Sequence, residues 1–301
     1  MVSSLSPRDQ VFLNNINRIA ERLDKAQRQI ATGIGLAQVS DSPDQISTLL
    51  SARASLSAAN QTQTNLGRVK AAVDVSEQAL RSGVDLLDRV QTLAAQAATS
   101  TQTADGRASI GQEVGSILQQ LVGLAATQVE GRYVFSGNSD QTAPYSIDPT
   151  QATPVSSYQG TAASSVAQHP NGTTFQIAHT AQEIFDSTDP TTNIFVALTN
   201  LQQALSSNDQ TGVQASLDGF KAISSHLNTQ LAFYGTTQNE VADATTFGSN
   251  LQLQLQTQIA NIENADPTAA ILELNQASIQ QQAALSARAR VPRTTLFDYL
   301  G

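Results

Sequence analysis

The sequence predicts a mainly α-helical protein, a long antiparallel helical bundle or coiled-coil rod from both chain termini with a small β-rich insert. Three observations predict this class. Apolar residues recur at alternating steps of three and four over most of the chain. Aromatic residues make up only 5% of the 301 residues, and tryptophan is absent. Five of the nine prolines fall between residues 138 and 190, where the helical pattern stops.

The longest periodic stretch is residues 43–98, where the only proline is the first residue. Its heptad pattern predicts one helix, which would be roughly 80 Å long. We expect two partners, a local antiparallel helix at 110–128 after a turn at 99–106, and a returning helix at 241–262. The predicted internal seam consists of Leu66, Val69, Val73, Leu80, Leu87, Ile117, Leu121, Leu251, Leu255 and Ile262.

Both chain ends carry further helical patterns. Ser6-Pro7 is typical of a helix start, and that pattern is closed by Gly33 and Gly35. Toward the other end, Asp266-Pro267 interrupts or kinks the helical pattern. Residues 296–300 form a mainly apolar tip in which only Asp298 is charged, and this favours a buried, intermolecular contact over a frayed tail. The predicted assembly surface consists of Leu5, Phe12, Ile16, Ile19, Leu23, Ile30, Leu272, Ile279, Leu285, Arg288, Arg290, Arg293, Leu296, Phe297, Tyr299 and Leu300.

These patterns predict five segments along the chain. They are an N-terminal assembly arm and turn (1–42), the first half of the helical rod (43–137), the β-rich insert (138–190), the second half of the rod (191–265) and a C-terminal assembly arm (266–301). Around and within the insert, β-prone runs at 133–135, 155–158 and 173–177 predict short strands.

Composition excludes several function classes. The net charge of −9 argues against nucleic acid as a partner, because phosphate binding needs a surplus of lysine and arginine. The lack of cysteine removes disulfides, thiolate metal sites and cysteine nucleophiles. No window has the length of a membrane span, and residues 1–10 hold no apolar run typical of a signal peptide. Export from the cell would therefore need another route.

No motif predicts a catalytic, cofactor or metal site. His169, His179 and His226 do not share metal-ligand spacing, and no serine lies in a nucleophile-elbow pattern. Asn171-Gly172-Thr173 matches the N-glycosylation pattern, but a tight turn is the favoured interpretation. The three arginines 288, 290 and 293 suit either a helix C-terminus or acidic groups of a neighbouring subunit, and both interpretations stay open.

Five short motifs, in order and separated by helical patterns, resemble the flagellin superfamily over residues 5–137 and 190–300. They are QIATG at 29–33, SDSP at 40–43, EGRYVFSG at 130–137, IENAD at 262–266 and LFDYL at 296–300. The third and fifth are similar to the hook–filament junction branch of that superfamily. Asn264 and Pro292 depart from the junction pattern, so flagellin itself remains an alternative.

The resemblance implies a structural, non-enzymatic subunit of the bacterial flagellum, located outside the cell. It implies export through the flagellar secretion apparatus without a cleaved signal, and a chaperone before secretion. It further implies a ring of identical subunits between the first hook-associated protein and flagellin, with no membrane or nucleic-acid partner. Terminal helices of such proteins order on assembly.

Two other classes are weighed against this one. An enzyme with the insert as catalytic domain lacks any catalytic spacing. A soluble helical adaptor remains a less favoured alternative, which would differ from an assembly subunit by having compact, protease-resistant chain ends.

Overall fold

The computed structural model describes residues 7–36 and 43–290. Over these residues the protein is mainly α-helical and has only small two-stranded sheets, which confirms the predicted fold class. The chain forms two compact units. Unit 1 comprises residues 1–58 and 252–301, and unit 2 comprises residues 59–251.

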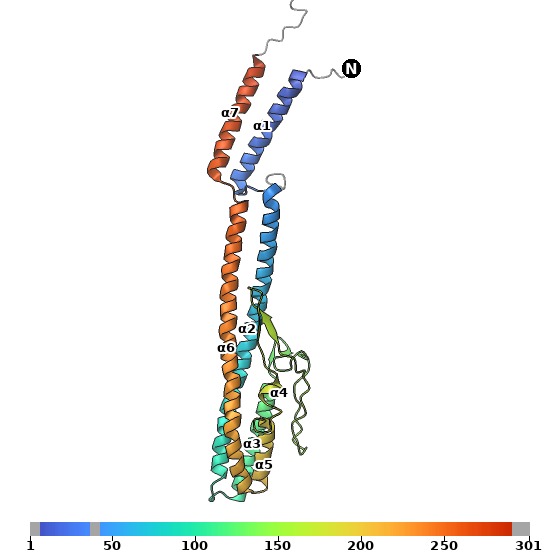
Figure 1. Ribbon diagram of the computed structural model, residues 1–301, viewed down its shortest axis with the longest axis vertical. Coiled ribbons are helices and arrows are strands. Elements are labelled where there is room, and N and C mark those ends of the chain that lie inside the picture. Colours follow the sequence, from blue (N-terminus) through green and yellow to red (C-terminus); the bar gives the residue numbers. More distant parts are fainter. Residues whose placement is uncertain (1–6, 37–42, 291–301) are drawn as a thin grey trace, which may run out of the picture. The chain divides into compact units, whose positions relative to one another are not determined.

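Unit 1 contains two complete helices, α1 (Pro7–Thr32) and α7 (Pro267–Ala289), which lie side by side (Figure 1). The beginning of α2 (Pro43–Ala97) and the end of α6 (Gln210–Glu263) complete this unit. The long helix predicted from residue 43 is confirmed almost to the residue. The predicted helix at 241–262 belongs to a much longer one, because α6 already begins at residue 210.

A new helix begins where the sequence predicts an interruption. Asp266 is the N-cap of α7, and its side chain accepts hydrogen bonds from the backbone N–H groups of Thr268 and Ala269, at 2.8 and 3.2 Å. Pro267 follows in the first turn, where a missing N–H costs no hydrogen bond. The Asp-Pro pair therefore ends one helix and starts the next.

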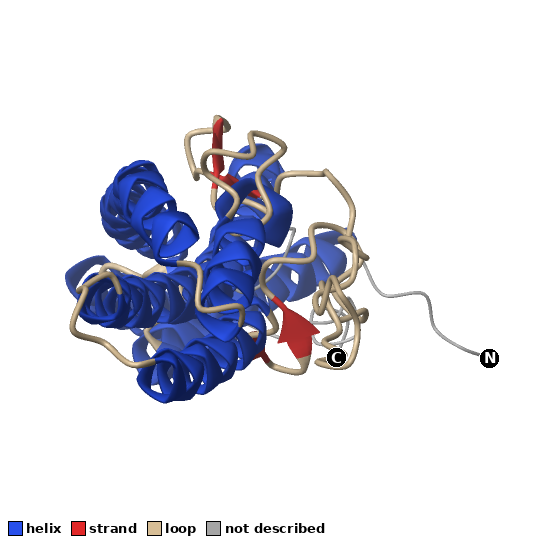
Figure 2. Cartoon of the chain, turned by 90° about the horizontal axis from the view of Figure 1, so that it is seen from below, coloured by secondary structure: helices blue, strands red, loops and turns tan. Residues whose placement is uncertain are grey.

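Unit 2 is built from the longer parts of α2 and α6 with shorter elements between them in the chain. These are α3 (Ala104–Ala125), β1 (Gln128–Val129), β2 (Arg132–Tyr133), β3 (Val166–Gln168), β4 (Thr174–Gln176), α4 (Ala181–Ile184) and α5 (Ile194–Ser206). The strands β1 and β2 pair antiparallel, as do β3 and β4. Both sheets are short and lie at the outside of the helices (Figure 2).

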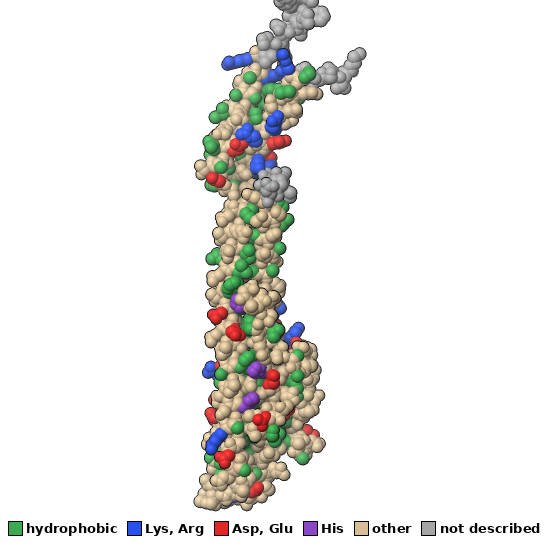
Figure 3. Space-filling view, in the orientation of Figure 1, with side chains coloured by type: hydrophobic (Ala, Val, Ile, Leu, Met, Phe, Trp, Pro, Cys, Tyr) green, Lys and Arg blue, Asp and Glu red, His purple; other side chains and the backbone are tan. Residues whose placement is uncertain are grey.

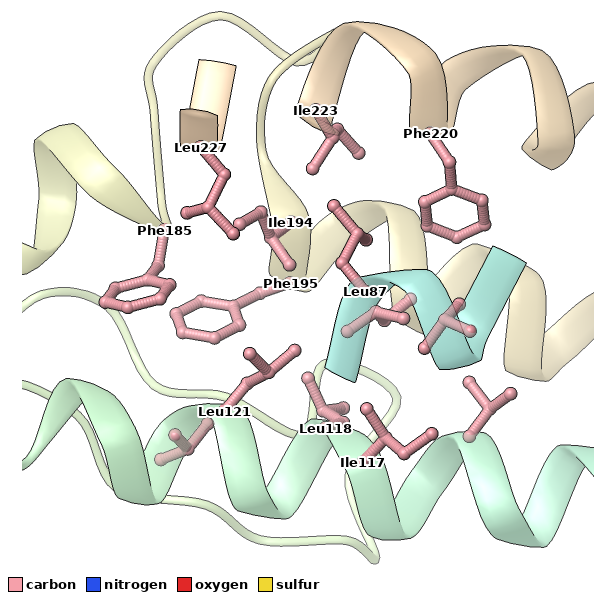
Figure 4. Packing of buried hydrophobic residues seen from close by; sticks show 14 of the residues in the cluster. Leu87, Ile117, Leu118, Leu121, Phe185, Ile194, Phe195, Phe220, Ile223 and Leu227 are labelled. Carbon is pink, nitrogen blue, oxygen red and sulfur yellow. The ribbon is translucent and has the colours of Figure 1, made fainter. Parts of the chain in front are cut away.

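One hydrophobic cluster holds unit 2 together. Side chains from α2, α3, α5 and α6 point toward one another, and Phe185, just after α4, joins them (Figure 4). The rings of Phe185 and Phe135 meet edge to face at 6.1 Å, and Phe135 meets Tyr234 of α6 in the same way at 6.3 Å. Such aromatic pairs add to the stabilisation from burial alone.

The helix α2 carries a regular line of buried residues, which belongs to this core from Val73 onward. Leu66, Val73, Leu80, Leu87 and Ala94 follow one another at steps of seven residues, and none is more than 2% exposed. The other members of the predicted internal seam divide into two groups. Ile117 and Leu121 are buried as well, whereas Val69, Leu251, Leu255 and Ile262 are half-buried.

A buried arginine fixes the turn between α2 and α3. Arg107 is only 5% exposed, and its guanidinium donates hydrogen bonds to the carbonyls of Ala97 (2.9 Å) and Thr99 (3.0 Å). It also donates to the side chain of Asn208 at 2.7 Å, in the turn between α5 and α6. A cation at the C-terminal end of α2 is favourably placed for the helix dipole. One side chain thus joins two turns that are distant in sequence.

The insert contains less strand than predicted. Residues 155–158 do not form a strand, and Val155 makes only an isolated bridge with Ile147. The two segments are still joined by a backbone hydrogen bond, in which the N–H of Ser156 donates to the Ser146 carbonyl at 2.9 Å. Prolines on both sides of this pairing lack an N–H and stop the ladder. The strand β3 was not predicted, and of residues 133–135 only Tyr133 lies in a strand.

Replacing Leu87 by alanine should lower the free energy of unfolding of unit 2 by about 2–5 kcal/mol, because the lost side chain leaves a cavity in the core. Urea denaturation followed by circular dichroism measures this change. The control is Val196→Ala on α5, where the side chain is 45% exposed and the change should stay within about 0.5 kcal/mol. Equal effects of the two substitutions would contradict the core described above.

Candidate assembly surface

The helices α1 and α7 pack together through small residues. Among the described residues of α1 only Ala26 is fully buried, and among those of α7 only Ala270 and Ala277, at 3% and 0% exposed. Alanines at this seven-residue spacing form a narrow, flat seam that allows two helix backbones to lie close together. The fully buried part of this seam therefore contains no large side chain among the described residues.

Four of the five large aliphatic side chains of α7 are exposed instead, whereas Leu274 is half-buried. Ile271, Leu272, Ile279 and Leu285 are 49–66% exposed. On α1, Val11, Leu13 and Ile30 are exposed to 40% or more. We call these seven residues the aliphatic surface. In Figure 3, hydrophobic side chains reach the surface along α1 and α7 between lysine and arginine side chains.

This exposure is concentrated in the smaller unit. Of the thirteen exposed large hydrophobic residues in the described part of the chain, ten belong to unit 1. Scattered apolar residues are normal on any protein surface, but a concentration of them on one element marks an interaction surface. The aliphatic surface is therefore the strongest candidate for a functional site in the described residues.

Ion pairs connect the two helices around the alanine seam. The guanidinium of Arg22 on α1 donates to the carboxylate of Glu273 on α7 at 2.5 Å and to Gln280 at 2.9 Å. Hydrogen bonding to Arg22 holds the pKa of Glu273 below its usual value. Nearer the free ends, Arg288 pairs with Asp9, and its guanidinium lies 5.5 Å from the centre of the Phe12 ring.

The structure places the predicted assembly residues in three groups. Phe12, Ile16, Ile19 and Leu23 are half-buried on α1, whereas Ile30, Leu272, Ile279, Leu285, Arg288 and Arg290 are exposed. Leu5, Arg293, Leu296, Phe297, Tyr299 and Leu300 lie outside the described residues. Three exposed residues of the aliphatic surface, Val11, Leu13 and Ile271, were missed. Each stands next to a predicted residue, so the same apolar clusters contained the signal.

The histidines each have a structural role. His179 stacks on Phe233 with ring centres 3.9 Å apart, and His226 contacts the backbone carbonyl of Glu183 at 2.9 Å. His169 lies 5.2 Å from the Phe247 ring. In the described residues no three His, Cys, Asp or Glu side chains are grouped to hold a metal ion.

The Asn171-Gly172-Thr173 sequence forms the tight turn between β3 and β4. The Asn171 side chain accepts a hydrogen bond from the Thr173 N–H at 2.9 Å, and Gly172 has a φ of +95°. A glycine is suited to that backbone conformation.

In the part of the chain that the structure describes, no helix is long and apolar enough to cross a membrane.

Comparison with known families decides what kind of protein carries this surface. The model of the bacterial flagellin N-terminal helical region matches residues 8–140, and that of the flagellin C-terminal helical region matches residues 218–300. The chain belongs to the flagellin family. The predicted resemblance is thereby confirmed, and the two matched regions of this family member include both α1 and α7.

Curated relatives within the family are hook-associated proteins. The chain is 29% identical over 287 residues to flagellar hook-associated protein 3 of Escherichia coli K12, and 28% identical to the Salmonella typhimurium protein of that name. Each alignment covers 87% of this chain and 87% of the relative.

Solved structures of this group share the fold. A putative flagellar hook-associated protein from Vibrio parahaemolyticus superposes with a TM-score of 0.66 at 21% identity, over 74% of this chain and 100% of its own. Flagellar hook associated protein-3 from Legionella pneumophila gives 0.62 at 12% identity, over 70% of this chain and 98% of its own.

Replacing Glu273 by glutamine should speed amide exchange in α7 at pH 7, because the charge-assisted hydrogen bond to Arg22 is lost. A carboxylate with a lowered pKa stabilises the fold above its unfolded-state pKa, and that stabilisation is lost as the pH falls through the folded-state pKa. The difference in α7 amide exchange rate between the variant and the unmodified chain should therefore vanish in acid, after correction for intrinsic exchange rates.

The control is Gln280→Ala, which removes the neutral partner of Arg22. Its effect on amide exchange in α7 should be the same at pH 7 and in acid, because neither Arg22 nor glutamine titrates between them. A Glu273→Gln effect that persists unchanged at low pH would show that the carboxylate charge contributes nothing.

Proposed function

We propose that this protein is the structural subunit that joins the hook to the filament of the bacterial flagellum, assembling through its terminal helices. The observation that carries this proposal is the outward aliphatic surface on α1 and α7, the helices that lie within the two matched flagellin regions. The names of the relatives, whose alignments cover 87% of the chain, support the junction rather than the filament.

The proposed partners are further copies of the chain in a ring, the first hook-associated protein on one side and flagellin on the other. Symmetric rings arise when one surface of a subunit binds a different surface of the next. The aliphatic surface supplies the apolar area for such contacts, and burying it contributes about 25 cal/mol per Å². Arg290, exposed at the end of α7, supplies a cation for acidic groups of a neighbour, whereas Arg288 already pairs with Asp9 of the same chain.

The protein acts outside the cell and has no enzymatic activity in this proposal. It travels through the flagellar secretion apparatus without a cleaved signal and is held by an export chaperone beforehand. A chain without cysteine suits this route, because it cannot form cross-links while unfolded.

Changing Leu272 and Ile279 together to glutamine should abolish incorporation into flagella without unfolding the monomer. Both side chains are more than half exposed, at 57% and 66%, so the isolated chain loses little burial. Incorporation is measured by immunoblotting of purified flagella and by swimming of a strain that makes only the variant. The thermal unfolding curve of the purified variant should match that of the unmodified chain.

The matched control is Val166→Gln, which alters a 63% exposed side chain on β3 in unit 2. This variant should assemble normally. Normal swimming with the double variant would show that the aliphatic surface is not needed for assembly. Labelling the assembled protein tests the location: a band at the distal end of the hook supports a junction subunit, and label along the whole filament supports flagellin instead.

A further inference from the structure

The tip of the β3–β4 hairpin lies against both long helices of unit 2. The ring of His169 lies 5.2 Å from the ring of Phe247 on α6. A Cβ built at Gly248, the next residue of α6, would lie 3.4 Å from Cγ of Pro170 and 2.5 Å from Oε1 of Gln63 on α2. Three elements therefore meet at a residue that has no side chain. In Figure 1 this hairpin reaches farther along α2 and α6 than the rest of the insert does.

The turn of the hairpin holds this tip in one conformation. The N–H of His169 donates to the Thr173 carbonyl at 2.8 Å, and the N–H of Gly172 donates back to the His169 carbonyl at 2.8 Å. Between them, the ring of Pro170 restricts the backbone φ. The N–H of Asn171 donates to Nδ1 of His169 at 3.1 Å, which orients the imidazole. The hairpin therefore positions the two residues that contact α6.

This contact lies beyond the hydrophobic cluster of unit 2. The fully buried residues of that cluster begin at Val73 on α2 and extend to Tyr234 on α6. Farther along the two helices are residues 59–68 of α2 and 241–251 of α6, which we call the stem. The hairpin tip contacts the stem at Gln63, Phe247 and Gly248.

The stem buries few large side chains. Leu66 and Val241 are its only fully buried large residues, and Leu251 is half-buried. The remaining fully buried residues are small, namely Ala59, Ala244 and Gly248. The Gln63 amide donates to the Ser249 hydroxyl across the two helices at 3.5 Å, a long hydrogen bond. Because helices in proteins are stabilised mainly by burial against their neighbours, the stem is held weakly by its own contacts.

We propose that the β3–β4 hairpin is a strap, which keeps α2 and α6 paired along the stem, beyond the end of the hydrophobic cluster. Pro170 lies over Gly248 and His169 lies beside Phe247, so the tip covers α6 next to Gln63 of α2. The insert then determines how far the long helices stay folded in the single chain. This inference concerns unit 2 alone and does not rest on the function proposed above.

The first test separates the strap from the stem in the full-length chain. Gly248→Gln places a side chain where Pro170 and Gln63 now lie. Amide exchange, followed by mass spectrometry, should become about fivefold faster or more in the stem and stay unchanged in α3 and α5. Helix propensity alone predicts the opposite sign, because glutamine is a better helix former than glycine.

The matched control is Gly219→Gln, the same substitution at an exposed glycine of α6 where a built Cβ meets nothing within 4 Å. This variant should leave exchange in the stem unchanged. If Gly248→Gln fails to speed exchange in the stem, the hairpin does not hold it. Faster exchange in α3 and α5 as well would mean that all of unit 2 depends on the contact, which contradicts a strap acting on the stem.

The second test fastens the strap covalently and does not depend on how well Gly248→Gln folds. Pro170→Cys with Gly248→Cys introduces the only two cysteines of the protein. The 3.4 Å between a built Cβ at 248 and Cγ of Pro170 is close enough for a disulfide between the two positions. We expect the native protein to oxidise readily, and exchange in the stem to slow roughly tenfold on oxidation.

The control for this test is Val166→Cys with Gln176→Cys, which stand opposite each other in β3 and β4. Their disulfide joins the two strands but does not tie the hairpin to a helix, so exchange in the stem should stay as it was. A Pro170→Cys and Gly248→Cys pair that oxidises only in denaturant would overturn the proposal. Oxidation of that pair without slower exchange in the stem would overturn it as well.

Discussion

Unit 2 depends on covering one line of side chains along α2. Burying a leucine or valine stabilises a fold by about 1.5–3 kcal/mol, so Leu66, Val73, Leu80 and Leu87, which are buried at steps of seven, supply a large fraction of the available stability. An isolated helix cannot obtain this burial. The partners come from α3, α5 and α6, which lie on both sides of the insert in sequence. Unit 2 can therefore be completed only after the chain has returned from the insert.

The sequence predicts the helices well because their burial is periodic. A heptad of leucines and valines leaves little choice of conformation, and α1, α2 and the Asp266-Pro267 break appear as expected. The strands of the insert are predicted poorly, because no such periodic burial marks them. Residues 155–158 have β-prone side chains, but Pro154 and the other prolines nearby have no N–H to donate, which prevents a continuous ladder of hydrogen bonds. The β3–β4 hairpin depends on the turn at Asn171 and Gly172, which local propensity identifies as a turn without showing which flanking residues pair.

The assembly surface is predictable only in part. Heptad spacing locates the apolar residues of α1 and α7 but does not say which of them a neighbouring helix covers within the monomer. Phe12 and Ile16 are half-buried, while their neighbours Val11 and Leu13 are exposed. On α7 the buried positions are alanines, which a search for large apolar residues ranks below Leu272 and Ile279.

The two seams differ in the size of the side chains that they bury, and this difference separates folding from assembly. On α2 the large residues point inward, so unit 2 satisfies its own apolar area. On α7 the small residues point inward, and Ile271, Leu272 and Ile279 remain outside. The fully buried residues of the α1 and α7 pair are alanines and exposed ion pairs surround them, so Ile271, Leu272 and Ile279 are not needed for that contact. Those side chains stay available for a second chain, and the apolar area that stabilises an assembly is the area that the monomer leaves exposed.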